Sequence, residues 1–268
     1  MSDYSVLMSV YYKERPEFLR RAIESVMSQT ILTNDFVIVC DGPLNDSLYK
    51  VLEEAKEKYK VLNIVQLEEN GGLGNALSIG ITKAKNEIVM RMDSDDVCVA
   101  NRAELQLPLM EEYDLVGGHI TEFENTEDNI IGCRKTPEKP EEIREFAKKR
   151  NPFNHPSVMF KKSVVLKAGN YQRFKFFEDY YLWIRILQIT DKVYNIQEVL
   201  VNMRSGKEMR SRRAAKEAKK SIKEIRKIMY KMKMINWFQC IFYTLGQIIF
   251  LSLSPRLKER IYRKVLRD

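Results

Sequence analysis

Three aspartates lie close together in the stretch IVMRMDSDDV, residues 88–97: Asp93, Asp95 and Asp96. Carboxylates this close repel one another and raise one another's pKa unless a cation compensates. A divalent ion held by one or two carboxylates and by substrate phosphates is the usual arrangement for Mg and Mn, and it would neutralise a departing diphosphate. The structural alternative is a helix N-cap and solvated turn, where aspartates are also common. The position directly after an apolar run favours the metal site.

Asp41 follows the apolar run FVIVC and stands before a Gly-Pro pair. A carboxylate in this place either shapes a turn or accepts hydrogen bonds from a nucleotide base or ribose. The loop ENGGLGN, residues 69–75, also follows an apolar run and includes Asn70. It is not the dinucleotide fingerprint G-x-G-x-x-G, because Leu77 occupies the third glycine position. A tight loop that lets a ligand approach the backbone is the better interpretation.

Glu178 and Asp179 stand at the start of a predicted helix. Negative charge at a helix N-terminus is stabilising by ~0.3–1 kcal/mol, which gives a structural explanation for both residues. The neighbouring Phe176 and Phe177 favour a second explanation, since an apolar environment raises the pKa of a carboxyl group toward that of a general base for a hydroxyl. His155, in the polar loop NPFNHPS, is a candidate contact to a phosphate or an acceptor.

The elements that must position these residues alternate between strand and helix. Apolar runs predict strands at 4–10, 36–40, 61–67, 87–92 and 113–120, and helical periodicity predicts helices at 16–29, 44–59, 74–85, 138–150 and 177–188. This alternation indicates an α/β fold with a mostly parallel sheet covered by helices on both faces. Ligands of such sheets bind beyond the carboxyl ends of the strands, where Asp41, the loop 69–75 and the aspartate cluster all lie. We therefore expect these three features to form one site.

Composition is that of a globular chain: 268 residues, 44% hydrophobic and 31% charged. The four cysteines are scattered, which favours reduced thiols over a disulfide framework or a zinc site, and no secretory leader is visible. Charge is distributed unevenly. Residues 201–268 hold 19 Lys and Arg against 5 Asp and Glu, a net charge of +14, whereas residues 1–200 have a net charge of −6. An acidic body with a basic tail is not a nucleic-acid-binding profile, and it suggests that the tail meets an anionic surface.

The tail, residues 206–268, is predicted to be helical and separate from a catalytic domain at 1–205. It combines a basic helix at 207–233, 17 uncharged residues at 237–253 and an amphipathic stripe at 256–267. Seventeen residues are at the lower limit of the ~17–25 needed to cross a bilayer. A helix lying in the membrane interface, with basic flanks on anionic headgroups, fits this pattern better than a spanning helix, and a helical cap packed on the catalytic domain is the structural alternative.

Taken in order, these motifs resemble the family 2 glycosyltransferases, which have the GT-A fold. The resemblance covers roughly residues 4–205 and rests on SVLMSVYYKERPEFLRRAIESVMSQT, VIVCDGP, ENGGLGNALSIGI, MRMDSDD, NPFNHPSVMFKKS and FEDYYLWIRIL. The sequence of these segments is especially similar to that of amylovoran-type exopolysaccharide and O-antigen glycosyltransferases of bacteria. One departure is Cys40, where the family often has a first acid before the Asp41 position.

The resemblance implies inverting transfer of a sugar from a UDP-sugar, with Mn or Mg as cofactor. Asp179 would be the catalytic base and Asp95 the metal ligand. The donor nucleotide would contact Val10, Tyr11, Asp41, Asn70 and Asp93, and the candidate acceptor or phosphate contacts are His155, Glu178 and Arg204. The acceptor would be a glycan or a lipid-linked (undecaprenyl-diphosphate) sugar at the cytoplasmic face of the bacterial inner membrane, with no nucleic acid as partner.

Two other functions fit the same residues. A nucleotidyltransferase that makes a sugar nucleotide also uses an α/β sheet and acidic metal ligands, but the first predicted strand ends in YYKE without the glycine-rich loop such enzymes want. A non-catalytic protein that binds a membrane or a nucleic acid would explain the basic tail but not the acidic cluster.

Overall fold

The computed structural model describes residues 3–205 and 216–253 of the chain. Within them, nine strands form one sheet in the order β3-β2-β1-β4-β8-β6-β9-β5, with β7 paired to β6. The strands are β1 (Tyr4–Val10), β2 (Asp35–Cys40), β3 (Leu62–Gln66), β4 (Ile88–Asp93), β5 (Val97–Cys98), β6 (Leu115–Phe123), β7 (Ile130–Arg134), β8 (Met159–Lys161) and β9 (Val193–Arg204). Strands β3, β2, β1 and β4 are parallel, so their carboxyl ends share one edge.

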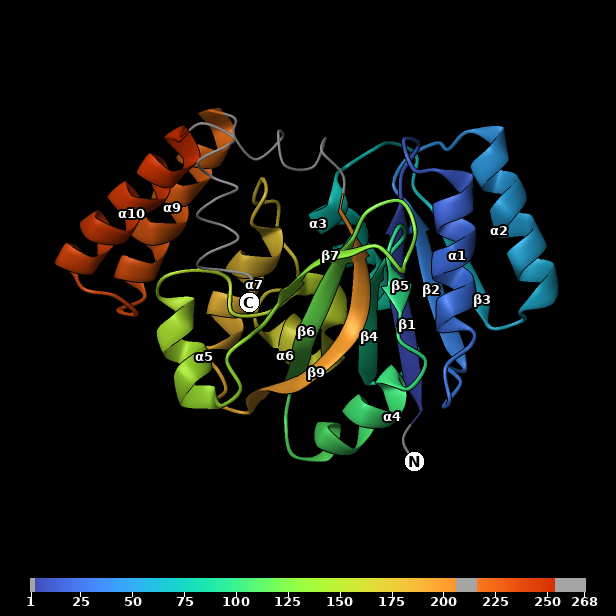
Figure 1. Ribbon diagram of the computed structural model, residues 1–268, viewed down its shortest axis with the longest axis horizontal. Helices are drawn as coiled ribbons and strands as arrows, with labels where there is room; N and C mark the ends of the chain where they lie inside the picture. The colour runs from blue at the N-terminus through green and yellow to red at the C-terminus, as the bar shows by residue number, and fades with distance from the viewer. Residues whose placement is uncertain (1–2, 206–215, 254–268) are drawn as a thin grey trace.

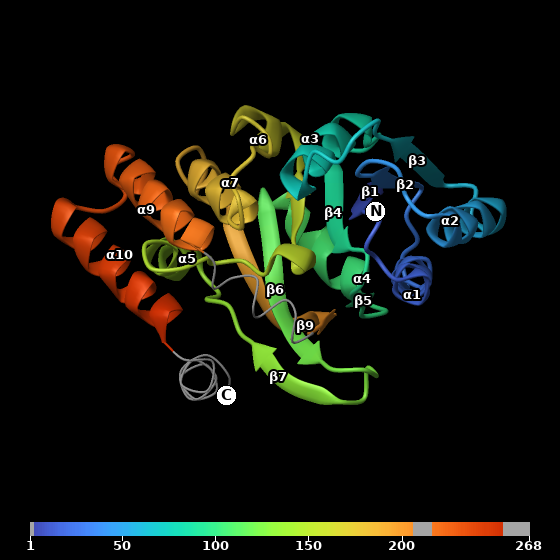
Figure 2. The ribbon, with the colours of Figure 1, turned by 90° about the horizontal axis from the view of Figure 1, so that it is seen from above.

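Helices cover the sheet on both faces (Figures 1 and 2). They are α1 (Pro16–Val26), α2 (Asp46–Lys58), α3 (Leu73–Lys83), α4 (Arg102–Gln106), α5 (Pro140–Ala147), α6 (Lys162–Lys167), α7 (Glu178–Ile186), α9 (Lys216–Lys231) and α10 (Trp237–Ser252), with short 3-10 turns at Leu107–Glu111 and His155–Ser157. The apolar faces of α1 and α2 lie against one side of the parallel strands, and those of α3, α6 and α7 lie against the other.

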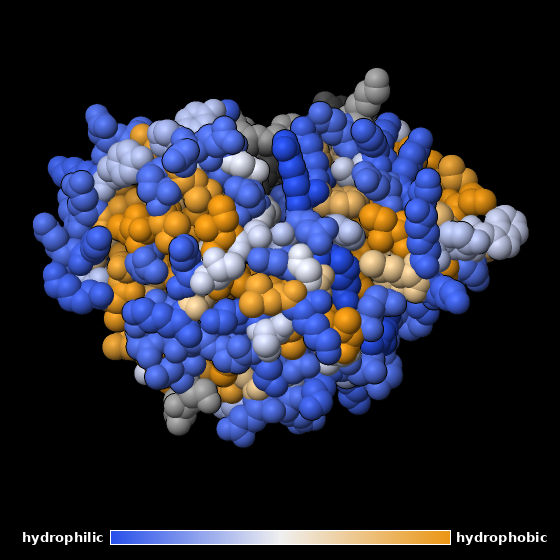
Figure 3. All heavy atoms as spheres, turned by 180° about the vertical axis from the view of Figure 1, so that it is seen from behind, coloured by the Kyte–Doolittle hydropathy of each residue, from blue (hydrophilic) through white to orange (hydrophobic). Residues whose placement is uncertain are grey.

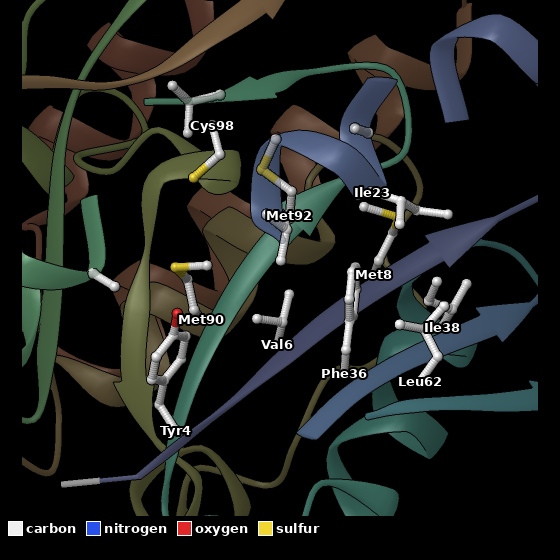
Figure 4. Packing of buried hydrophobic residues seen from close by; sticks show 14 of the residues in the cluster. Tyr4, Val6, Met8, Ile23, Phe36, Ile38, Leu62, Met90, Met92 and Cys98 are labelled. Carbon is white, nitrogen blue, oxygen red and sulfur yellow. The ribbon is translucent and has the colours of Figure 1, made fainter. Parts of the chain in front are cut away.

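Strand β1 is almost entirely apolar because helices cover both of its faces. Val6 and Met8 point into the core beneath α1, where they share a cluster with Ile23 (Figure 4). Leu7 points to the opposite face and packs with Leu77 of α3. Because successive side chains of a strand alternate between faces, a strand covered on both sides needs apolar residues at every position.

The predicted α/β alternation is confirmed, with ends that differ by a few residues. The sequence analysis did not predict β9, which is twelve residues long and runs parallel to β6 in the interior of the sheet. Its pattern is broken by the exposed pair Gln197 and Glu198, near which the register to β6 shifts. Because of this irregularity, β9 lacks the regular alternation of apolar and polar residues by which a strand is recognised in a sequence.

The C-terminal helices α9 and α10 lie side by side at one end of the molecule, with α9 between α7 and α10 (Figures 1 and 2). Helix α9, within the basic helix predicted at 207–233, has an apolar face. Its residues Ile225 and Met229 are buried against Tyr180 and Ile184 of α7. None of the described helices is both long enough and apolar enough to cross a membrane. The amphipathic stripe at 256–267 lies outside the described residues.

Arg226 of α9 is completely buried and ties this helix to the end of α5. Its guanidinium donates hydrogen bonds to the backbone carbonyls of Lys148 and Lys149, and it lies 3.3 Å from the hydroxyl of Tyr180. That hydroxyl donates in turn to the carbonyl of Ala147. The last carbonyls of a helix have no partner within the helix, so the arginine and the tyrosine together cap α5.

Candidate active site

The aspartate cluster lies at the carboxyl end of β4, where Ser9 of β1 and Asp93 are in register. Both oxygens of Asp93 accept hydrogen bonds from the guanidinium of Arg91, one of them at 2.6 Å. The Arg91 side chain is 1% exposed, so this bidentate pair is held in a largely dry environment. The sequence analysis missed Arg91, although a residue two positions earlier in a strand points to the same face.

Asp96 is buried and is held by the end of β9. One of its oxygens accepts from the backbone N–H of Arg204 at 2.8 Å, and the other receives no hydrogen bond from the described residues. Burial raises the pKa of Asp96 well above its usual value, and the charges of Asp95 and Asp93 raise it further.

Arg204, predicted as a candidate phosphate contact, lies beside the cluster. Its guanidinium donates to the backbone carbonyl of Asp95 at 3.1 Å and lies over the rings of Phe18 and Phe123, 3.7 and 4.6 Å from their centroids. These contacts hold a positive charge in a fixed place next to the aspartates.

Asp95 is the cluster's remaining carboxylate, and no side chain of the described residues donates a hydrogen bond to it. The pKa of Asp95 is raised to about 7, mainly by burial and also by the charges of Asp93 and Glu14. Glu14, in the loop after β1, accepts a hydrogen bond from Ser94 at 2.7 Å, and its own pKa is raised by burial. The sequence analysis missed Glu14, which lies 80 residues away from Ser94 in the chain.

The charge of these carboxylates favours a bound divalent cation, but they do not supply enough ligands to hold one alone. The crowding of Asp95 with Asp93 and Glu14 is the charge excess that a cation would relieve. Among residues 3–205 and 216–253, however, no three His, Cys, Asp or Glu side chains are grouped closely enough to form a metal site alone. The donor set therefore suits an ion that takes its other ligands from phosphate oxygens and water.

Asp41 lies at the end of β2, next to the loop at 69–75. Its two carboxylate oxygens accept from the backbone N–H groups of Gly71 and Gly72 at 2.8 and 3.0 Å, and the amide of Asn70 donates to its carbonyl. Gly42 has φ +82°, and a β-carbon there would lie 2.6 Å from the backbone nitrogen of Asn70. The two segments predicted to bind the nucleotide are thus built against each other, with Asp41 fixing the loop.

The first strand contributes mainly backbone at this edge. The side chain of Val10 is buried in the core, and its carbonyl accepts from the N–H of Asp41 at 2.8 Å. Tyr11 is half-buried, with its ring edge-on to Tyr12. Of these two predicted nucleotide contacts, only Tyr11 has a side chain that is not committed to the core.

Asp179 lies in the first turn of α7, as predicted. One oxygen accepts from the side-chain amide of Asn151 at 2.6 Å, and the other accepts from the N–H of Tyr180 at 2.7 Å. These two bonds fix the orientation of the Asp179 carboxylate. Asn151 belongs to the loop NPFNHPS, whose polar character was noticed in the sequence, but its contact with Asp179 was not predicted.

Tyr171 links the aspartate cluster to α7. Burial is the main cause of its raised pKa, and the charges of Asp93, Asp179 and Glu178 add to it while Arg91 opposes them. All four charged groups therefore lie within electrostatic reach of the Tyr171 hydroxyl. Asp93 and the carboxylates of α7 thus act on a common side chain, although more than 80 residues separate them in the chain.

His155 packs among aromatic rings at the base of this site. One ring nitrogen lies 2.8 Å from the hydroxyl of Tyr171, and the ring is edge-on to Trp183. Burial lowers the pKa of His155 well below its usual value, and Arg91 lowers it further. Neutral imidazole is the stable form here, so the predicted contact with a phosphate would have to be made without a positive charge.

Glu178 lies next to the glycine-rich loop. A β-carbon added to Gly74 would approach the Glu178 side chain to 3.3 Å and the carbonyl of Gln172 to 3.1 Å. The start of α3 and the start of α7 are thus close together, and Glu178 lies at their junction.

Comparison with known proteins agrees with this geometry. Residues 5–174 match the model of glycosyl transferase family 2. The chain belongs to this family. It is 34% identical to the amylovoran biosynthesis glycosyltransferase AmsE of Erwinia amylovora, over 97% of this chain and 98% of that one. It is also 34% identical to the UDP-Gal:alpha-D-GlcNAc-diphosphoundecaprenol beta-1,3-galactosyltransferase of Escherichia coli, over 100% and 99% of the two chains.

Solved structures share this fold at low sequence identity. Residues 1–349 of S. aureus TarS, in complex with UDP-GlcNAc, align with a TM-score of 0.68 and 17% identity, over 98% of this chain and 76% of that one. The mannosyltransferase PcManGT of Pyrobaculum calidifontis, in complex with GDP-Man and Mn²⁺, aligns with a TM-score of 0.64 and 13% identity, over 98% and 79%. The predicted GT-A fold and the prediction of a glycosyltransferase are both confirmed, and the nucleotidyltransferase and non-catalytic alternatives are not retained.

Proposed function

We propose that this family 2 glycosyltransferase moves a sugar from a UDP-sugar to a hydroxyl of a lipid-linked acceptor, with inversion at the anomeric carbon. The observation that carries the proposal is that Tyr171 lies within electrostatic reach both of Asp93, in the aspartate cluster, and of Asp179, which Asn151 holds in the first turn of α7. One group of carboxylates suits a diphosphate and its cation, and the other suits an attacking hydroxyl. This pairing matches a single displacement better than a glycosidase, whose two carboxyl groups flank the bond that breaks.

The UDP moiety of the donor is assigned to the edge formed by β1, β2 and the loop 69–75. Asp41 keeps about two lone-pair positions beyond its bonds to the loop, and Asn70 and Tyr11 are at the same edge. The ribose is assigned to Asp93, whose orientation is set by Arg91. Arg204, whose guanidinium is fixed over the rings of Phe18 and Phe123, is assigned to the negative charge of the diphosphate.

Asp95 is the residue that would hold Mn or Mg, together with phosphate oxygens of the donor. When bound, such an ion supplies charge neutralisation for the departing diphosphate. The chain's own residues prepare this position by placing Asp93 and Glu14 beside Asp95 at a buried strand end, with Arg204 bounding it on one side.

In the reaction, the acceptor hydroxyl oxygen forms a bond to the anomeric carbon while the bond from that carbon to the diphosphate oxygen breaks. The hydroxyl proton moves to Asp179, and UDP carries away the bonding electron pair. Asn151 holds the Asp179 carboxylate in one orientation through its amide. A positioned base of this kind contributes about 10²–10⁴-fold to the rate. Glu178 and His155 border the same space and are assigned to the acceptor.

The acceptor class is suggested by the relatives. One is named for its action on a GlcNAc-diphosphoundecaprenol acceptor, and another for amylovoran biosynthesis. We assign this chain to the same kind of work, the assembly of a bacterial exopolysaccharide or O-antigen on a lipid carrier at the cytoplasmic face of the inner membrane.

A donor panel tests the proposal. The full chain is incubated with a set of UDP-sugars, Mn²⁺ or Mg²⁺ and a short undecaprenyl-diphosphate-sugar analogue, and both UDP and pyrophosphate are measured. We expect UDP release that depends on metal, on one donor and on the acceptor. Pyrophosphate release, or acceptor-dependent turnover that EDTA leaves unchanged, would contradict the proposal.

A further inference from the structure

Helix α10 presents an unpartnered apolar face at the outer end of the molecule. Six large hydrophobic side chains of this helix are 50–65% exposed: Trp237, Phe238, Ile241, Phe242, Leu245 and Ile249. Five of them recur at helical spacing along one side, from 238 through 241, 242 and 245 to 249. Figure 3 shows hydrophobic residues on the surface at this end of the molecule. Single exposed hydrophobic residues are ordinary, but a continuous patch of this kind marks an interaction site.

The dimensions of α10 suit a helix that lies along a bilayer. Its 16 residues correspond to about 24 Å at ~1.5 Å per residue, less than the ~30 Å hydrocarbon core. An N-terminal cap fixes where it starts, because the Asn236 side chain accepts from the N–H of Gln239 and the Gln239 side chain accepts in return. Trp237 at this end is of the residue type enriched at the boundary between headgroups and acyl chains.

Positive charge lies on the neighbouring helix. Helix α9, packed along α10, exposes Lys220, Lys223, Lys227 and Lys231, which recur at helical spacing and so form one stripe. Lys219 reaches across to donate to Ser252 at the end of α10. Residues 201–268 carry a net charge of +14.

We propose that the exposed face of α10 docks into the surface of an anionic lipid bilayer, with the α9 lysine stripe on the headgroups. The charge decides between this occupant and a second copy of the chain. Pairing two α10 faces would bring two segments of net charge +14 together, whereas an anionic surface attracts each nearby Lys. The acidic body, of net charge −6, is held away from such a surface.

The docked helix is mechanically connected to the catalytic carboxylate. Helix α9 packs on α7 through Ile225 and Met229, and α7 carries Asp179 in its first turn. Docking α10 would therefore hold the active site at a constant height and orientation over the membrane. This consequence rests on the proposed function, since it matters only if the acceptor is lipid-linked, whereas the docking itself does not depend on it.

Vesicle flotation of the full chain tests the proposal. Vesicles of phosphatidylglycerol and phosphatidylethanolamine are compared with vesicles of phosphatidylcholine alone. Phe242→Glu with Leu245→Glu places charges on the apolar face at side chains that are 63% and 54% exposed. Leu32→Glu with Ile130→Glu, at 62% and 56% exposure, is the matched control far from α10. Lys223→Glu with Lys227→Glu alters the stripe, and Lys56→Glu with Lys60→Glu makes the same change near α2.

We expect the unaltered chain and both control variants to float with the anionic vesicles. The apolar-face variant and the stripe variant should each lose at least about tenfold in partition coefficient, with weaker binding at high salt. No binding by the unaltered chain, or equal binding by the apolar-face variant, would overturn docking. A dimer in light scattering without lipid that Phe242→Glu with Leu245→Glu dissociates would overturn it in favour of a second copy.

Transfer is measured in the same variants with a detergent-dispersed acceptor. Docking variants should keep turnover there, because Phe242 and Leu245 lie outside the active site. Flotation without any turnover would refute the proposed function and leave the docking intact, so the two failures are distinguishable.

Discussion

Asp179 is oriented by hydrogen bonds from the Asn151 amide and the N–H of Tyr180. We predict that Asp179→Asn lowers kcat by about 10²–10⁴-fold while UDP affinity changes little, because the amide keeps the size of the side chain but cannot take a proton. Single-turnover kinetics and calorimetric titration of UDP measure the two effects. Asp191→Asn, at an exposed position outside the site, is the control. A collapse of UDP affinity would mean that Asp179 is a donor ligand and not the base.

Asp95 is the proposed metal ligand, and its negative charge destabilises the folded protein when no metal is bound. Its pKa is raised to about 7 by burial and by Asp93 and Glu14, so above its unfolded pKa near 4 the charged form destabilises the folded protein. We predict that Asp95→Asn abolishes metal-dependent turnover and, in EDTA at pH 8, raises the free energy of unfolding by on the order of 1 kcal/mol or more.

Asp114→Asn gives the opposite control in the same urea-unfolding experiment. Burial alone would raise the pKa of Asp114, but hydrogen bonds from Thr190 and Lys161 outweigh it and lower the pKa, so its charge stabilises the fold. Normal metal-dependent activity in Asp95→Asn would remove the metal assignment, and a loss of stability there would remove the repulsion argument.

At the scale of elements, the active site depends on how α5, α7 and α9 are joined. Arg226 donates to the carbonyls of Lys148 and Lys149, and Asn151, two residues further on, holds Asp179. Helix α9 is therefore part of the support of Asp179, the proposed base, and not only an attachment.

We predict that Arg226→Met lowers the free energy of unfolding by about 2–4 kcal/mol, because it leaves buried carbonyls without their charged donor. At a temperature where the variant stays folded, kcat should fall while the KM for the donor changes little. Lys227→Met, an exposed neighbour on the same helix, should match the unaltered chain in both measurements. Equal urea midpoints for the two variants would contradict the structural role of Arg226.

At the scale of the whole molecule, the folded chain keeps His155 neutral. Burial and Arg91 hold its pKa below the unfolded value near 6.5, so as pH falls below that value the unfolded state binds a proton that the folded state does not. The contribution of His155 to stability is therefore greatest above pH 6.5 and declines as pH falls toward the folded pKa.

We predict that this group alone removes up to about 1 kcal/mol of stability between pH 7 and pH 5.5. Urea unfolding of the unaltered chain and of His155→Gln at both pH values isolates it, because other titrating groups are common to both proteins. The difference between the two proteins in free energy of unfolding should change with pH by that amount. A difference that is constant with pH would show that His155 binds a proton as readily in the folded state as in the unfolded state.

The order of strands and helices from β1 to β4 follows from the sequence alone, because hydrophobic periodicity is local, whereas the irregular strand β9 does not. The apolar runs ending at Val10, Cys40 and Asp93, and the helical repeats between them, dictate a parallel sheet with its polar residues at one edge. Asp41, Asn70 and the three aspartates were found in this way, since the position of a residue at a strand end can be read without knowing its neighbours.

Only the tertiary structure decided which polar groups form hydrogen bonds across the chain. Arg204 reaches Asp96 across 108 positions of sequence, Ser94 reaches Glu14 across 80, and Arg226 reaches Lys148 across 78. Such contacts depend on how elements pack, which no local pattern encodes. The same reason applies to the tail: the sequence predicted a basic helix and an uncharged segment, but packing decided that α9 buries its apolar face on α7 while α10 leaves its own exposed.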